Sequence, residues 1–478
     1  SASPPAPGRA DAAVGAYPRR MRHHDLVVIG TGSGNNIVDE AFADLDVAIV
    51  EHGPFGGTCL NVGCIPSKML SYPADLAESI SRAAAYGIDA SIDKVRWSDI
   101  RDRVFGRLDP IAEDGRDHRI NSCPSVEVYL GHARFTGPLR LRVERTDGTG
   151  YDDLSADRMV LAAGARPMVP EQVATAGVPF ETSDSIMRRP ELPRRLAILG
   201  GGYVAVEFAH LFAALGSAVT VIDMADQLLG TQDETVAKRF TELARRRYGV
   251  RLGGQVSEVT GEEGDILITL DDGAALEADT LLVAVGRVPN SDRLNVRAAG
   301  IDVHPDGRVA VDSQQRTSVP GIYALGDLST AVQLKHVANR EARVVAHNLL
   351  HPDDPIETDN SLVPAAVFTN PQIASVGRTE QDCRDEELDY TVSTQPYSDT
   401  AYGWALEDTT GFCKIIAERG SGRLLGAHLM GPQAPTLIQP LVIAMTFDID
   451  ARALARRPYW IHPALPEVVE NALLKLTV

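Results

Sequence analysis

Residues 25 to 35, DLVVIGTGSGN, begin as a short apolar run and end in a glycine-rich turn. A second apolar run, DVAIVE, occupies residues 46 to 51. Apolar runs of this length are typical of buried strands, and the residues between them are numerous enough for a helix. The stretch therefore predicts a βαβ unit in the order strand, glycine turn, helix, strand.

The turn carries the residues that a dinucleotide site needs. Gly30 permits the tight turn, and Gly32 lets the backbone approach a pyrophosphate at the helix N-terminus. Glu51, nineteen residues after Gly32, stands where a carboxylate accepts hydrogen bonds from a ribose diol. The usual third glycine is Asn35 here, but Gly34 beside it can relieve crowding between helix and strand. We expect a dinucleotide at this first unit.

The same pattern returns in residues 196 to 223, LAILGGGYVAVEFAHLFAALGSAVTVID. Gly200, Gly202 and Ala205 match the motif G-x-G-x-x-A, and Asp223 follows Gly202 by twenty-one residues. Two glycine turns without a ligand would have to explain the same placement of an acid twice. The chain is therefore predicted to hold two dinucleotide sites.

The segments around the two units suggest how the chain is organised. A helical pattern fills residues 67 to 122, and short strands are expected in residues 125 to 163. TLLVAVGRVPN, residues 280 to 290, closes the second unit, and GIYALGD, residues 321 to 327, is predicted to return to the first as a strand. From about residue 360, strand patterns are followed by helical ones.

The composition limits the partners. The net charge of −19 repels phosphate backbones and anionic lipid heads, so we expect neither nucleic acid nor membrane as a partner. No apolar run approaches the roughly 20 residues that span a bilayer, and the N-terminal residues lack the apolar core of a secretory signal. The prediction is a cytoplasmic protein that acts on a small molecule.

Two of the five cysteines, Cys59 and Cys64, lie close together in GGTCLNVGCIPSK, residues 56 to 68. A structural zinc site usually has four ligands, and no second cysteine pair or nearby histidine accompanies these two, so no metal is expected. A stable disulfide framework does not suit a reducing cytoplasm, where a cysteine pair is usually catalytic or redox-sensing. A reactive pair is the favoured interpretation.

Two dinucleotide sites and a cysteine pair suggest a relay of electrons from nicotinamide to flavin, then to a disulfide and to the substrate. Cys59 follows Glu51 by only eight residues, so the pair should lie beside the cofactor of the first unit. Positions five apart in a regular helix differ by about 140° in azimuth, so bridging Cys59 and Cys64 needs a departure from helical backbone. Gly63 and Pro66 could permit it.

Several motifs together resemble those of the flavoprotein disulfide reductases of the glutathione reductase and lipoamide dehydrogenase type. They are GGTCLNVGCIPSK, the two glycine motifs, GIYALGD and IHPALPE, and the likeness covers nearly the whole chain from Met21. Within this family, GTGSGN, HVANREARVVAHNLL, YGWALEDTTG and YWIHPALPEVVENALL are most similar to the branch that reduces mycothione, the disulfide of mycothiol. The alternatives are a dihydrolipoamide dehydrogenase and a non-enzymatic redox sensor.

The resemblance implies an α/β fold with two Rossmann-like dinucleotide-binding domains and a C-terminal α+β dimerisation domain. The expected division of the chain is a flexible tail (1–20), an FAD-binding domain (21–167), an NAD(P)-binding domain (168–288), a return segment of the FAD-binding domain (289–358) and a dimerisation domain (359–478).

The resemblance also implies roles for matching residues. Cys64 would be the thiolate that faces the flavin, and Cys59 the thiol that attacks the substrate disulfide. Lys68 would lie near flavin N5 and pair with Glu207. Further contacts to the cofactors are expected from Gly34, Gly57, Thr58, Ala133, Gly164, Tyr203, which would cover the nicotinamide pocket, Arg287, and Asp327, which would bind the ribityl chain.

The departing thiols need a proton donor that titrates near neutral pH, which is the range of histidine. His462 is the candidate, because Pro463 and Pro466 restrict its backbone and Glu467 follows five residues later as a carboxylate partner. In the family this pair comes from the other subunit, which implies a homodimer with a shared active site.

The family and the residues point to different nicotinamide donors. The resemblance implies NADPH, whose 2′-phosphate needs a nearby cation. Asp223 instead stands where an acid accepts the ribose 2′-hydroxyl, Asp226 adds negative charge, and no Lys or Arg follows until Lys238. A more distant Arg287 could still reach a phosphate. We favour NADH.

Overall fold

The computed structural model describes residues 21–478 and begins with the first nucleotide unit. Its parallel sheet has the order β15-β5-β1-β2-β3, with Leu26 opposite Val47 and Tyr323 opposite Val160. The strands are β1 (Arg22–Ile29), β2 (Val47–Glu51), β3 (Val126–Gly137), β5 (Tyr151–Leu161) and β15 (Ile322–Ala324). The prediction that GIYALGD returns to the first unit is confirmed, because β15 pairs with β5.

The helix predicted between β1 and β2 is not an α-helix, and this prediction was wrong. Two short 3-10 helices take its place, η1 (Gly34–Asn36) and η2 (Glu40–Phe42). Asp39 between them is extended, and its carboxylate accepts a hydrogen bond from Ala41 N at 2.9 Å. A carboxylate that bonds the nearby backbone in this way competes with helical hydrogen bonds and starts a new turn.

Residues 67 to 122 are mainly helical, as predicted, in α2 (Cys64–Arg82) and α3 (Trp97–Ser122), which follow the short α1 (Gly57–Asn61). The strands after them are longer than the short strands expected, because β3 and β5 continue beyond the parallel sheet. There both pair with β4 (Arg140–Arg145) in an antiparallel meander.

The second unit contains a parallel sheet in the order β13-β7-β8-β9, and its glycine turn leads into a regular α-helix, α5. An antiparallel sheet β10-β11-β12 is attached to it. The bounds are β7 (Arg195–Leu199), α5 (Tyr203–Ala214), β8 (Ala218–Asp223), α6 (Glu234–Ala244), β9 (Gly249–Leu252), β10 (Val256–Glu262), β11 (Asp265–Leu270), β12 (Ala275–Ala278) and β13 (Thr280–Val283).

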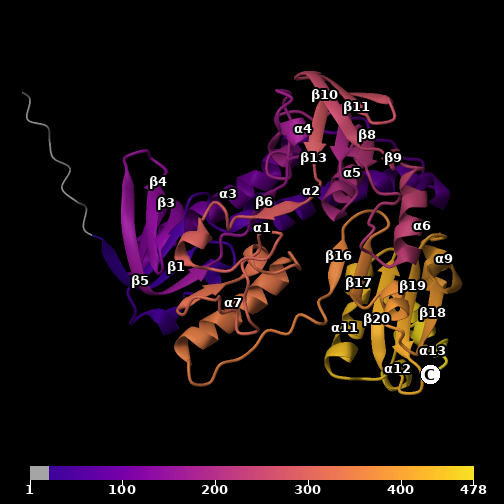
Figure 1. Ribbon diagram of the computed structural model, residues 1–478. Helices are drawn as coiled ribbons and strands as arrows, with labels where there is room; N and C mark the ends of the chain where they lie inside the picture. The colour runs from indigo at the N-terminus through magenta and orange to yellow at the C-terminus, as the bar shows by residue number, and fades with distance from the viewer. Residues whose placement is uncertain (1–20) are drawn as a thin grey trace, which may run out of the picture.

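The C-terminal part is α+β, with strands followed by helices as predicted. In Figure 1 this part is orange to yellow and lies at the lower right, below the second unit, and the first unit lies at the left. Its antiparallel sheet has the order β16-β17-β20-β19-β18. The bounds are β16 (Ala365–Val367), β17 (Ile373–Gly377), α8 (Glu380–Asp385), β18 (Tyr390–Pro396), α9 (Ala401–Ala405), β19 (Phe412–Glu418), β20 (Leu424–Met430), α10 (Ala434–Leu437), α11 (Gln439–Thr446), α12 (Ala451–Arg456) and α13 (Pro466–Leu474).

The remaining elements connect these parts. β6 (Ala165–Pro167) and β14 (Arg287–Pro289) pair antiparallel where the chain leaves and re-enters the first unit, α4 (Glu171–Ala174) follows β6, and α7 (Lys335–Leu350) packs on the first unit. Within residues 21–478, no helix is both long and apolar enough to cross a membrane.

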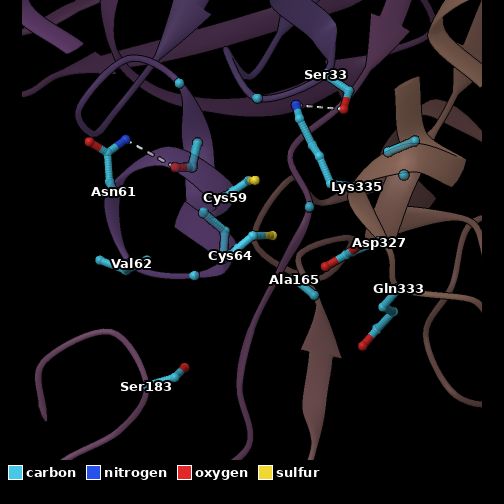
Figure 2. Close-up of a pocket in the computed structure, with 18 of the residues that line it drawn as sticks. Ser33, Cys59, Asn61, Val62, Cys64, Ala165, Ser183, Asp327, Gln333 and Lys335 are labelled. Atoms are coloured by element: carbon cyan, nitrogen blue, oxygen red, sulfur yellow. Dashed lines mark hydrogen bonds between the residues drawn. The ribbon is translucent and has the colours of Figure 1, made fainter. Parts of the chain in front are cut away.

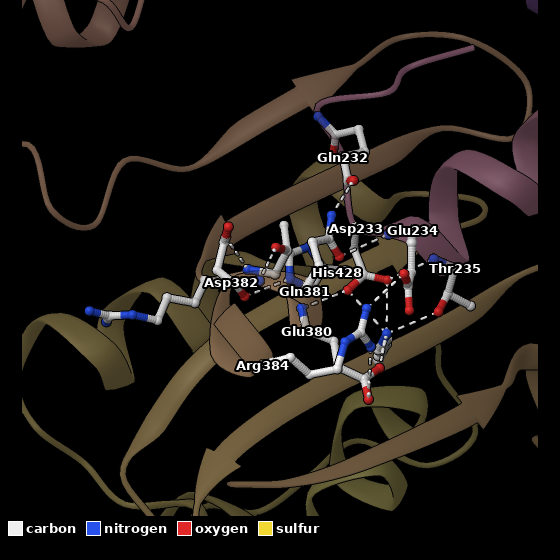
Figure 3. Close-up of polar contacts among 12 residues, drawn as sticks. Gln232, Asp233, Glu234, Thr235, Glu380, Gln381, Asp382, Arg384 and His428 are labelled. Carbon is white, nitrogen blue, oxygen red and sulfur yellow. Dashed lines mark hydrogen bonds and ion pairs between the residues drawn. The ribbon is translucent and has the colours of Figure 1, made fainter. Parts of the chain in front are cut away.

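A buried polar cluster joins the second unit to the C-terminal part (Figure 3). The ammonium group of Lys414 donates to both carboxylate oxygens of Asp233, at 2.9 and 3.0 Å, and to Thr235 Oγ1 at 2.9 Å. Glu380 Oε2 lies 2.5 Å from the same nitrogen. Burial would raise the pKa of Asp233, but the hydrogen bonds from Lys414 and from the Glu380 N–H bring it below its usual range.

Candidate active site

A cavity of about 1770 Å³ runs along the first unit and reaches the cysteine pair. Gly30 adopts φ +100°, and a Cβ there would lie 2.3 Å from Ala162 O. At Gly34, a Cβ would lie 2.8 Å from Ala162 Cβ and 3.2 Å from Val28 Cγ1. The close packing usually made by the third glycine of the motif is thus made by Gly34.

Arg119 forms hydrogen bonds with Asn35, the residue that replaces the usual third glycine. From α3, its guanidinium group donates to Asn35 Oδ1 at 2.9 Å and to the carbonyl oxygens of Asn35 and Val38 at 2.8 Å. In an α-helix these carbonyls would bond N–H groups four residues later. Arg119 therefore replaces those bonds. Its position in a polar helix 84 residues away gave no motif by which the sequence analysis could find it.

Glu51 lies at the end of β2 in the wall of this cavity. Its carboxylate accepts hydrogen bonds from Thr31 N and Thr31 Oγ1, at 2.9 and 2.7 Å, and from the backbone N–H groups of His52 and Gly53, both at 2.8 Å. Burial would raise the pKa of Glu51, but hydrogen bonds from His52, Gly53 and Thr31 hold it below its usual value. The group is a charged acceptor at the place where a ribose is expected.

The cysteine pair lies at a break between two helices. Cys59 is in α1 and Cys64 is the first residue of α2, with Gly63 between them at φ −136° and ψ −117°. A Cβ at Gly63 would lie 2.9 Å from Thr58 O. The break occurs at Gly63, whereas Pro66 lies in the first turn of α2, where a helix tolerates proline.

Both cysteines are free thiols in this structure, and they differ in acidity. A hydrogen bond from Cys59 is the main cause that lowers the pKa of Cys64 to about 7, and the charge of Lys68 contributes. The same interaction and burial raise the pKa of Cys59. A thiol with a pKa near 7 is substantially ionised at neutral pH and therefore reactive.

Lys68 connects the three parts of the chain next to this pair. Its Nζ donates to Glu207 Oε2 of α5 at 2.5 Å and lies 4.4 Å from the centroid of the Phe368 ring. The other oxygen of Glu207 accepts from Phe368 N at 2.8 Å. The predicted pairing of Lys68 with Glu207 is therefore present in the structure.

The far wall of the cavity carries Asp327 and Arg287. Arg287 Nε lies 3.9 Å from Asp327 Oδ2 and is buried without a hydrogen-bond partner, while Nη2 donates to Ala165 O at 2.5 Å. Burial raises the pKa of Asp327. An unsatisfied buried donor in a cavity wall indicates room for a polar ligand. The carboxylate of Glu51, the glycine turn at Gly30 and the polar wall with Asp327 and Arg287 together fit a flavin dinucleotide.

The other cofactor residues predicted for the first unit lie in the same wall; they are Gly32, Gly57, Thr58, Ala133 and Gly164. Gly34 is the exception, since it packs behind the turn instead of lining the cavity.

A second cavity, of about 580 Å³, lies at the glycine turn of the second unit. Gly200, Gly202 and Asp223 line it, and Tyr203 lines both cavities. Asp223 Oδ1 accepts from Ala225 N at 2.7 Å. Of the described residues in this wall, Arg287 is the only Arg or Lys; its Nη2 donates to Ala165 O, and its Nε faces Asp327 in the first cavity.

His462 and Glu467 are close to each other but do not line either cavity. His462 Nδ1 lies 2.6 Å from Glu467 Oε1, and the His462 side chain is 69 % exposed. Within one chain, the structure therefore does not bring this pair to Cys59. Among the described residues, no group of three or more His, Cys, Asp or Glu side chains could hold a metal ion.

The sequence analysis missed Lys335, Ser33 and Asn339, which line or border the first cavity and contact one another. Lys335 and Asn339 both lie on α7, and only the packing of α7 on the glycine turn brings them to Ser33.

Comparisons with known proteins agree with this geometry. The family of pyridine nucleotide-disulphide oxidoreductases matches residues 24–342, and the dimerisation domain of that family matches residues 363–473. Mycothione reductase of Mycobacterium tuberculosis is 52 % identical over 95 % of this chain and 100 % of its own length.

More distant relatives have other substrates in their names. Dihydrolipoyl dehydrogenase of Halobacterium salinarum is 32 % identical over 94 % of this chain and 95 % of its own length. Glutathione reductase of Burkholderia cepacia is 33 % identical over 93 % of this chain and 97 % of its own length. Among solved structures, the HOCl-induced flavoprotein disulfide reductase RclA of Escherichia coli superposes with a TM-score of 0.83 at 27 % identity, covering 94 % of this chain and 99 % of that chain.

Proposed function

The chain belongs to the pyridine nucleotide-disulphide oxidoreductase family, and from this premise we propose that it reduces mycothione to two molecules of mycothiol with NADH. It is a flavoprotein disulfide reductase, and its family implies FAD and a nicotinamide dinucleotide as cofactors, a small disulfide as substrate and a homodimer as the assembly. The enzymatic relatives leave no support for a non-enzymatic redox sensor.

The observation that carries the proposal is the free cysteine pair in the wall of the first cavity, in a chain 52 % identical to a mycothione reductase over nearly its whole length. When bound, FAD would supply the two-electron transfer between the nicotinamide and the Cys59–Cys64 disulfide. Glu51 would hold its ribose, the glycine turn its pyrophosphate and Asp327 its ribityl chain. These roles are proposals that rest on the positions described above.

The chain's own residues then carry the disulfide exchange. The Cys59 thiolate attacks one sulfur of mycothione, which forms a mixed disulfide and releases the first thiolate. Cys64 attacks Cys59 Sγ, which restores the enzyme disulfide and releases the second thiolate. The partner subunit's His462, oriented by Glu467, supplies protons. Overall, one enzyme dithiol and one substrate disulfide become one enzyme disulfide and two thiols.

We also propose NADH as the donor, because Asp223 lies at the end of β8 in the second cavity, where a 2′-phosphate would meet like charge. The same proposal includes the domain limits given above, at residues 167, 288 and 358. It also includes a reducing, cytoplasmic setting for the thiol chemistry.

The test is a steady-state assay of mycothione, lipoamide and glutathione disulfide, each with NADH and with NADPH. We expect the highest kcat/KM for mycothione with NADH. A higher value for lipoamide, together with rapid oxidation of dihydrolipoamide by NAD, would favour the second candidate, dihydrolipoamide dehydrogenase, to which relatives of 31 to 34 % identity correspond.

A further inference from the structure

Lys335 places a positive charge in the wall of the first cavity, opposite the cysteine pair. It is the first residue of α7 and is half-buried. Its Nζ donates to Ser33 Oγ at 2.9 Å, and Ser33 Oγ in turn donates to Asn339 Oδ1 at 3.0 Å. Asn36 Nδ2 donates to the same Asn339 oxygen at 3.2 Å. The lysine is therefore held by a polar chain from the glycine turn.

This position is electrostatically unfavourable for a lysine. The N-terminus of a helix carries a partial positive charge, and α7 has neither an acidic residue in its first turn nor a side-chain cap on Leu334. Among the described residues, no carboxylate forms an ion pair with Lys335, whereas the other lysine of the cavity, Lys68, is paired with Glu207. A residue that departs from a local electrostatic preference in this way is often functional.

Lys335 and Cys59 line the same cavity. Figure 2 shows Cys59 and Cys64 pointing into the space that Lys335 and Asp327 border on the other side. The hydrogen bond with Cys64 and burial raise the pKa of the Cys59 thiol, and Lys335 is the nearby charge that opposes them. Cys64 is influenced instead by Lys68 and by Asp327. The charged groups facing the two thiols are thus Lys335, Lys68 and Asp327.

We propose that Lys335 is a positioning residue that acts through Cys59, because its ammonium group stabilises the Cys59 thiolate as this sulfur attacks the substrate disulfide. The proposal rests on the function proposed above, in which Cys59 is the attacking thiol. It adds an electrostatic partner within the same subunit to the proton donor expected from the partner subunit.

The test measures the rate at which iodoacetamide alkylates Cys59 from pH 5 to 10 in the FAD-loaded, two-electron-reduced enzyme, with Cys59 identified by mass spectrometry of its peptide. Lys335→Met removes the charge at similar length and should raise the apparent pKa of Cys59 and slow alkylation at pH 7 about 10-fold, which corresponds to about one pKa unit. Lys335→Arg keeps the charge and should stay within about twofold of the unmodified enzyme.

Lys94→Met, at an exposed lysine outside both cavities, is the matched control and should leave the profile unchanged. If Lys335→Met does not fold or does not retain FAD, Lys335→Gln is measured in its place. A pH profile of either variant that superimposes on that of the unmodified enzyme would overturn the proposal. Because alkylation needs no mycothione, a shifted profile supports the role of Lys335 even if the natural disulfide is a different one.

Discussion

His462 and Glu467 form a contact of 2.6 Å between Nδ1 and Oε1 that lies outside the cavity of the cysteine pair. Glu467 is 17 % exposed, whereas His462 is largely exposed, and the neighbouring Tyr459 and Ile461 are 103 % and 72 % exposed. Exposed large apolar side chains beside an oriented imidazole are typical of an interface. A second copy of the chain, covering this surface, would bring His462 to another subunit's cysteines.

We therefore expect activity to return when two inactive dimers exchange subunits. Cys59→Ser and His462→Gln homodimers should each retain less than about 1 % of the activity, since loss of a nucleophile or of an acid–base group typically costs 100-fold or more. After exchange, hybrid dimers contain one site with both an intact cysteine pair and an intact histidine. Hybrids verified by mass spectrometry should recover a measurable fraction of activity, and a mixture of Cys59→Ser with Cys64→Ser dimers is the control without recovery. Inactive verified hybrids would disprove the shared site.

The two cysteines should differ in their spectroscopic signature. On titration with dithionite, we expect a long-wavelength absorbance from a thiolate beside the flavin, because the pKa of Cys64 is lowered to about 7. Cys59→Ser should retain or strengthen this band, and Cys64→Ser should abolish it. A band that persists in Cys64→Ser would reverse the assignment of the two sulfurs.

The same band should depend on pH in a known direction. The thiolate of Cys64 is present above its pKa of about 7 and is lost as the pH falls below it, so the absorbance should decline between about pH 8 and 6. The control is Cys59→Ala, which removes the hydrogen bond that most lowers this pKa and should therefore lose the band at a higher pH.

Asp223 should determine the choice of nicotinamide donor. With one disulfide substrate and a fixed salt concentration, we expect a higher kcat/KM for NADH than for NADPH. The Asp223 carboxylate would repel the 2′-phosphate of NADPH and would lose its hydrogen bond to the ribose 2′-hydroxyl. Asp223→Arg should shift the ratio toward NADPH by about tenfold or more. Asp226→Arg adds a cation nearby but keeps Asp223, so it tests whether any cation at this place shifts the ratio toward NADPH. A tenfold preference for NADPH in the unmodified enzyme would contradict the interpretation of Asp223.

The Lys414–Asp233 pair should hold the second unit against the C-terminal part. Both side chains are almost fully buried, so Lys414→Met leaves an unpaired buried carboxylate and should reduce the free energy of unfolding by on the order of 3 kcal/mol, seen as a lower apparent Tm in calorimetry. The control is Arg384→Met, which removes the exposed ion pair with Glu234 and should change the free energy of unfolding by less than about 1 kcal/mol.

The contribution of Asp233 should also depend on pH. Its pKa in the folded protein is depressed, so its stabilisation is present above the unfolded value of about 4 and is lost as the pH falls through the folded value. The difference in Tm between the unmodified enzyme and Asp233→Asn should be constant from pH 7 to 5 and shrink below about pH 4. A difference that grows toward low pH would show that this carboxylate is not the charged partner of Lys414.

Features that depend on neighbouring residues could be predicted from the sequence alone. The turns at Gly30 and Gly200 both have positive φ, and a Cβ at either would lie 2.3 Å from a carbonyl oxygen, so glycine is required by the local backbone. Cys59 and Cys64 are only five positions apart, and so are His462 and Glu467. Chain connectivity therefore limits how far apart the two members of each pair can lie.

Features that join distant segments were decided only by the tertiary structure. Arg119 donates to Asn35, 84 residues away, Lys335 reaches Ser33 across 302 residues, and Lys414 reaches Asp233 across 181. Each of these polar groups is satisfied by a partner that packing places next to it, and neither the spacing nor the local pattern encodes that partner. The sequence thus determined the turns, the cysteine pair and the two nucleotide units, whereas the packing of sheets and helices decided which charges face one another in the active site.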